Sequence, residues 1–163
     1  MTKARIIANS ILFALSLLFA GAVSAEERYA GYYHPEVTSN ETFERVIRRP
    51  ASTGRSLRVD FVNVLTDSQL KAPESPRFVF FAKGSDAKTL ILVALDDEVF
   101  GTLFRARAIL AQLTVSVRTG RFFREEDLQY VATFFDLLQM MEFDELIITD
   151  GRNWTHKVDF IRE

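Results

Sequence analysis

The feature that most constrains the fold is a run of apolar residues over 102–118, spaced for a helix with two apolar faces. One face recurs at three- and four-residue steps, as Leu103, Ala106, Leu110, Leu113 and Val117. A second face adds Phe104, Ala108, Ala111 and Val115. A helix with so wide an apolar surface packs against a sheet or inside a bundle. We therefore predict a helix over 102–118, ended near Gly120 and buried on both of these faces.

Two runs that are apolar at successive positions predict the central strands of that sheet. They span 77–82 and 89–95, and continuous apolar runs are typical of strands covered on both sides. The link 83–88 is short and polar and contains Gly84. These features predict an antiparallel hairpin.

The remaining segments complete the set of expected elements. Apolar spacing predicts a second helix over 125–141, with Asp136 facing water. The β-branched content of 57–65 predicts a strand, and 41–49 fits a strand or, by its three-residue spacing, a helix.

The C-terminal region predicts a second hairpin. Residues 145–149 are a short apolar strand, Asp150-Gly151 opens a turn, and 154–161 alternates apolar and polar side chains. In the returning strand His156 shares the side of Val158 and Phe160, which predicts a partly buried, hydrogen-bonded histidine.

The grouping of strands and helices predicts the fold class. Strands and helices occur in separate runs along the chain rather than in strict alternation. That order favours an α+β domain. We predict a single domain with a mainly antiparallel sheet of about 5–6 strands and two long helices packed on it.

The first 25 residues have the layout of a secretory signal peptide. Lys3 and Arg5 give a basic start, 11–20 is almost wholly apolar, and 23–25 carries small residues before Glu26. We expect cleavage there and a periplasmic location. An uncleaved anchor in the inner membrane is the alternative, although the apolar run is short for a span.

The expected mature chain, 26–163, begins with an aromatic arm over 26–38. Tyr29, Tyr32, Tyr33 and His34 crowd ahead of a proline in this arm. Two interpretations stay open: the arm forms a binding surface for a partner, or it is an ordered arm packed on the sheet.

Charge and composition exclude several functions. Without the leader, which holds two basic residues and no acidic one, the net charge falls from −2 to −4. A general nucleic-acid binder normally has a basic excess, so we expect no nucleic-acid partner. The chain has no cysteine, which excludes disulfides, a thiol nucleophile and thiolate-bound metals.

Few residues are candidates for chemistry. Arg105 and Arg107, on the first turns of the predicted helix, could contact an anion or a carboxylate ligand, or could pair with the acids of 96–98. The two histidines, His34 and His156, lack metal-ligand spacing, and no G-x-S-x-G elbow occurs. We predict no catalytic residue, metal site or cofactor.

Four segments resemble a known family. They read RYAGYYHPEVTSNETFERVIR, RFVFFAKG, LFRARAILAQLT and FFDLLQMMEFDELIITDG. Over nearly the whole expected mature chain, and in its leader, the sequence resembles a family of small exported bacterial proteins whose function is not established. Members often carry the label molybdopterin-guanine dinucleotide biosynthesis protein A, which implies a nucleotidyltransferase that uses Mg²⁺ and guanine nucleotide.

Glycine spacing bears on that implied activity. A nucleotidyltransferase of this kind needs a glycine-rich turn whose backbone N–H groups reach the phosphates. This chain has seven glycines, and no two are closer than ten positions. We therefore expect an exported, non-catalytic accessory or binding protein whose partner is another exported or membrane protein, with contact to a membrane surface also open. The nucleotidyltransferase is the alternative.

Overall fold

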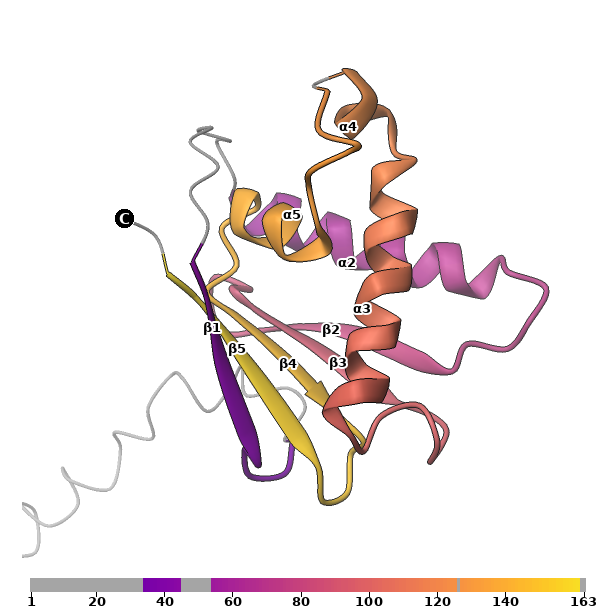
Figure 1. Cartoon of the computed structure of the whole chain (residues 1–163), viewed down its shortest axis with the longest axis vertical. Coiled ribbons are helices and arrows are strands. Elements are labelled where there is room, and N and C mark those ends of the chain that lie inside the picture. The colour runs from indigo at the N-terminus through magenta and orange to yellow at the C-terminus, as the bar shows by residue number, and fades with distance from the viewer. Residues whose placement is uncertain (1–33, 45–53, 126, 162–163) are drawn as a thin grey trace, which may run out of the picture. The chain divides into compact units, whose positions relative to one another are not determined.

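The computed structural model describes residues 34–44, 54–125 and 127–161 (Figure 1). These residues form a five-stranded sheet in the order β1-β5-β4-β3-β2. The strands are β1 (Ser39–Glu44), β2 (Phe78–Lys83), β3 (Thr89–Ala94), β4 (Glu145–Thr149) and β5 (Thr155–Ile161). The described helices are α2 (Arg55–Leu70), α3 (Leu103–Arg118), α4 (Arg121–Glu125) and α5 (Phe134–Met140).

The sheet is mixed rather than mainly antiparallel. Both predicted hairpins are confirmed, because β2 pairs antiparallel with β3 and β4 with β5. The other two pairings, β3 with β4 and β1 with β5, are parallel. A parallel pairing needs a long crossover, and three helices lie between β3 and β4. The α+β class and the single sheet are as predicted, but the prediction of a mainly antiparallel sheet is wrong.

Helix α3 begins and ends within one residue of the prediction. The hydroxyl of Thr102 accepts a hydrogen bond from the Arg105 backbone N–H at 3.3 Å and caps the first turn. Its first apolar face is buried, with Ala106 and Leu110 in the core.

The strand predicted over 57–65 is wrong, because this segment lies inside helix α2. Its β-branched residues suggested a strand, but the side chains that meet the sheet recur at helical steps. Arg58, Val62 and Leu65 are four and three positions apart, and Phe61 also packs against the core. For 41–49, β1 bears out the strand interpretation as far as Glu44, and 45–49 lie outside the described residues.

The long second helix predicted over 125–141 is also wrong. Helix α4 ends at Glu125, Asp127 takes a left-handed conformation with φ of 54°, and α5 begins only at Phe134. Thr133 and Asp136 form a capping box: the Thr133 N–H donates to Asp136 Oδ2 at 2.7 Å, and Thr133 Oγ1 accepts from the Asp136 N–H at 3.2 Å. Asp136 is therefore buried as a cap instead of facing water.

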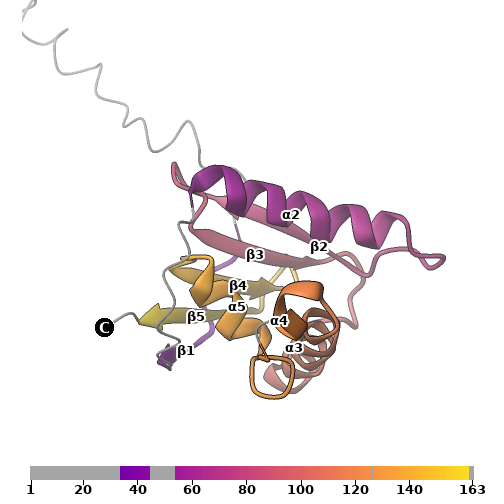
Figure 2. The ribbon, with the colours of Figure 1, turned by 90° about the horizontal axis from the view of Figure 1, so that it is seen from above.

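The main core lies between the sheet and helices α2, α3 and α5. In Figure 2, α2 runs along β2 and β3, whereas α3 and α5 lie towards β4, β5 and β1. The largest buried side chains of this core include Phe100, Phe134, Phe143, Leu92 and Ile148. Phenylalanine rings thus fill much of the layer between the helices and the sheet.

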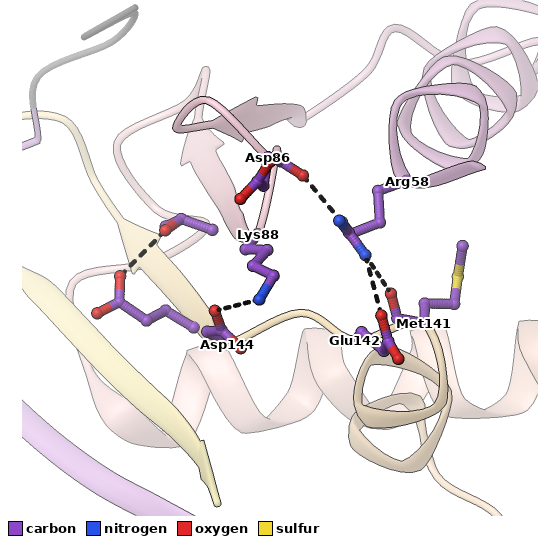
Figure 3. Close-up of polar contacts among 8 residues, drawn as sticks. Arg58, Asp86, Lys88, Met141, Glu142 and Asp144 are labelled. Carbon is purple, nitrogen blue, oxygen red and sulfur yellow. Dashed lines mark hydrogen bonds and ion pairs between the residues drawn. The ribbon is translucent and has the colours of Figure 1, made fainter. Parts of the chain in front are cut away.

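A buried arginine of α2 forms hydrogen bonds to the β2–β3 turn and to the end of α5 (Figure 3). Arg58 is only 3% exposed; its Nε donates to the Asp86 carbonyl at 3.0 Å and its Nη1 to the Met141 carbonyl at 3.2 Å. The Glu142 carboxylate lies 3.7 Å from Nη1. Nearby, Lys88 pairs with Asp144 at 3.3 Å. The guanidinium thus donates to carbonyls from the β2–β3 turn and the end of α5, contacts that no short-range sequence pattern predicts.

The β4–β5 turn is held by one carboxylate. Asp150 Oδ1 accepts hydrogen bonds from the N–H groups of Arg152, Asn153 and Trp154 at 2.9, 3.0 and 2.9 Å. Burial raises the pKa of this carboxyl, but the three N–H groups and the nearby Arg152 charge outweigh it, so the pKa lies below its usual 3.8.

We predict that Arg58→Ala lowers the free energy of unfolding by about 3 kcal/mol, because the buried Met141 carbonyl and the part-buried Asp86 carbonyl lose their donor. Arg55→Ala is the matched control, since exposed Arg55 also donates to this turn, to the Ser85 carbonyl at 2.9 Å. Arg55→Ala should lower the free energy of unfolding by less than about 1 kcal/mol. Urea unfolding measures both, and equal losses would show that the burial of Arg58 is unimportant.

A second prediction concerns Asp150→Asn. A carboxyl whose pKa is lowered by folding stabilises the native state above pH 3.8, and the effect is lost as the pH falls through the folded-state pKa. Asp150→Asn should therefore be less stable than the parent at pH 7, with a smaller difference at a pH well below 3.8. Urea unfolding at both pH values checks this, and a pH-independent difference would contradict it.

Candidate binding site between strand β1 and helix α3

A pocket of about 370 Å³ opens where β1, α3 and α5 meet. Pockets of this size hold a small molecule or a few side chains. We call it the edge pocket, because β1 is the last strand on its side of the sheet. Its lining is mostly apolar and comprises Glu41, Thr42, Phe43, Arg107, Leu110, Ala111, Thr114, Thr133, Phe134 and Phe135.

The edge pocket has one charged corner. Arg107 Nη2 donates to Glu41 Oε2 at 2.9 Å, and the other Glu41 oxygen lies 3.4 Å from His156 Nε2. Arg107 is exposed and Glu41 is half-buried. Arg107 therefore pairs with the Glu41 carboxylate and not, as one of the two interpretations had it, with the acids of 96–98. Asp97 of that cluster instead pairs with Arg152, at 2.8 Å.

His156 lies behind this corner as a structural residue, as its position in the strand predicted. It is 1% exposed, its Nδ1 is 2.9 Å from Ser39 Oγ, and the Trp154 ring stacks near it at 6.2 Å between centroids. Nε2 makes no hydrogen bond, and its nearest acidic neighbour is Glu41 Oε1, at 3.4 Å. The His156 side chain is thus buried beneath the charged corner of the pocket and contacts Ser39 of β1.

The second apolar face of α3 is exposed, contrary to the prediction that the sheet or a bundle would bury it. Phe104 is 83% exposed, and Ala108, Ala111 and Val115 on the same side are exposed too. These four residues are three to four positions apart and form a continuous stripe. Ala111 also lines the edge pocket, so the stripe and the pocket are one surface. We call the four residues the α3 stripe.

The structure accounts for only some of the residues singled out from the sequence. Arg107 lines the pocket, and exposed Arg105 lies on the first turn of α3 beside the stripe. His34 Nδ1 is 2.8 Å from the carbonyl oxygen of neighbouring Pro35. Tyr29, Tyr32 and Tyr33 lie outside the described residues.

Four polar pocket residues were not predicted from the sequence, namely Glu41, Thr42, Thr114 and Thr133. No motif marks them, and only the placement of β1 and α5 beside α3 brings them together. Among residues 34–44, 54–125 and 127–161, no cluster of three or more metal-ligating side chains occurs. None of the helices in these ranges is long and apolar enough to cross a membrane.

No family model, no curated protein and no solved structure matches this chain.

We predict that Glu41 matters more to stability than its partner Arg107. Glu41→Ala removes a half-buried carboxylate that contacts both the buried His156 and Arg107, whereas Arg107→Ala removes only the exposed partner of the ion pair. The coupling energy between Glu41 and Arg107, from a double-mutant cycle in urea, should be less than about 1 kcal/mol. A larger loss for Arg107→Ala than for Glu41→Ala would contradict this arrangement.

Proposed function

We propose that this protein is an exported, non-catalytic binding protein that docks another exported or membrane protein through the α3 stripe and the edge pocket. The exposure of Phe104 is the observation that carries the proposal. A phenylalanine with most of its surface in water gains about 1.5–3 kcal/mol when a partner buries it. A contiguous apolar strip of this kind is typical of a protein–protein contact.

The edge strand suits the same role. Among the described strands, β1 pairs only with β5, so its outer edge offers unpaired backbone groups. An extended segment of a partner can add to such an edge and place an apolar side chain in an adjoining pocket. Phe43 and Ala111 would contact that side chain in the edge pocket. The Arg107–Glu41 pair at its corner would favour partners with matching charges.

A crosslinking experiment tests the docking surface. A photo-reactive amino acid replaces Phe104 in one variant and exposed Val64, on α2, in another. In cells that produce the full chain, we expect a discrete adduct with another exported or membrane protein from position 104 only. Phe104→Asp combined with a reactive group at Ala111 should reduce that adduct at least tenfold.

Other outcomes would overturn the proposal. An adduct of twice the mass of the chain would identify a second copy as the occupant. Adducts with lipid alone would identify the membrane surface. Equal adducts from positions 104 and 64 would show that α3 has no special contact.

The nucleotidyltransferase implied by the family label is the competing function. Calorimetry with GTP and Mg²⁺ separates the two, because the binding protein should show no heat of binding at micromolar concentrations. Micromolar GTP affinity would favour the enzyme whatever the crosslinks show.

A further inference from the structure

A second pocket, of about 230 Å³, lies between α2, α3 and β2. Both helices pack on the same face of the sheet, and the space between them opens over β2 (Figure 2). Strands β2 and β1 lie at opposite ends of the sheet, and the two pockets share no lining residue. We call the second one the groove pocket.

The floor of the groove pocket is apolar and partly aromatic. Its side chains are part of the main core or pack against it: Leu65, Phe78, Phe80, Ile109 and Leu113. The rings of Phe78 and Phe80 meet edge to face, with 5.4 Å between their centroids. A third ring can extend such an arrangement. Because an apolar cavity of about 150 Å³ holds benzene, this pocket has room for one ring or two fused rings.

The rim of the groove pocket is polar and offers mainly hydrogen-bond acceptors. It consists of Ser68, Gln69, Gln112 and Ser116, and no charged side chain of the described residues lines the pocket. Ser68 Oγ donates to the Leu65 carbonyl at 2.7 Å, and Ser116 Oγ donates to the Gln112 carbonyl at 3.1 Å. Both hydroxyl groups thus use their proton within their own helix, while their oxygens can still accept. This rim favours an uncharged ligand that donates a hydrogen bond.

Gln69 adds an acceptor that the fold leaves unsatisfied. Its side-chain oxygen Oε1 is buried and has no hydrogen-bond partner within the described part of the chain. A buried acceptor without a donor costs free energy, which a donor on a ligand would offset. The terminal torsion of a glutamine side chain is soft, so this oxygen can turn towards a donor in the pocket.

We propose that the groove pocket binds a small, uncharged aromatic molecule that carries a hydrogen-bond donor, of the indole or phenol class. The ring packs on Phe78 and Phe80, and the donor reaches the Gln69 side-chain oxygen. This site does not depend on the proposed docking function, which uses the α3 stripe and the edge pocket.

Titration of the full chain with indole tests the proposal, with isoleucine and leucine methyl groups labelled for NMR. We expect saturable shifts of the Ile109 and Leu113 methyl signals, because both side chains line the groove pocket. The Leu110 methyl signals should not move, since Leu110 lines the edge pocket. Indene has the shape of indole without the N–H group, and it should bind at least threefold more weakly.

The variant Gln69→Met tests the role of the unsatisfied oxygen. It keeps an unbranched side chain of similar length, and the methyl spectrum reports whether the fold is retained. We expect the ratio of indole affinity to indene affinity to fall at least threefold in this variant.

Three results would overturn the proposal. The first is the absence of saturable shifts of Ile109 and Leu113 at millimolar indole. The second is a shift of the Leu110 signals instead, which would place indole in the edge pocket. The third is an equal preference for indole over indene in the parent and in Gln69→Met, or no preference in the parent.

Discussion

The parallel pairing of β1 with β5 is the contact on which the candidate site depends. It joins the first and last described strands and aligns Ser39 with His156 and Glu41 with Val158. Without it, Glu41 would not reach Arg107 and the edge pocket would lack one wall. Three phenylalanine rings reinforce the pairing: Phe43 lies 5.2 Å from Phe135 and 6.0 Å from Phe160 between ring centroids. The edge pocket thus rests on contacts between segments far apart in the sequence.

The two apolar faces of helix α3 lie in different environments, one in the core and one exposed to solvent. Its first face fills the core with Ala106 and Leu110, while the second leaves Phe104 in water. A single sheet can cover only one side of a helix, and the same sheet face is shared with α2 and α5. Apolar surface left uncovered by the fold is then available to a partner, which links the packing of this domain to its proposed function.

The charged clusters divide into structural and accessible groups. The guanidinium of Arg58 is buried and directed at carbonyls, so its hydrogen bonds specify how α2 and the end of α5 meet. His156 is similarly enclosed by Ser39, Trp154 and Glu41. Arg107, in contrast, keeps most of its side chain in water while contacting Glu41, so it can exchange that neighbour for a ligand group. Accessibility, more than residue type, separates a candidate binding group from a structural one.

What the sequence by itself determined was the local structure that nearby residues encode. Helical spacing and the Thr102 cap defined α3, and short polar turns between apolar runs defined both hairpins. Local patterns failed in two segments. At 57–65 the β-branched content predicted a strand, although the helical spacing of the same residues matches the observed helix. At 125–141 the apolar spacing predicted one long helix, but the Thr133 cap interrupts the run and starts a separate helix. The tertiary structure alone decided the parallel pairings, the burial of Arg58 and the meeting of Glu41 with Arg107. These contacts join residues from 28 to 117 positions apart. No short-range pattern encodes which distant segments become neighbours.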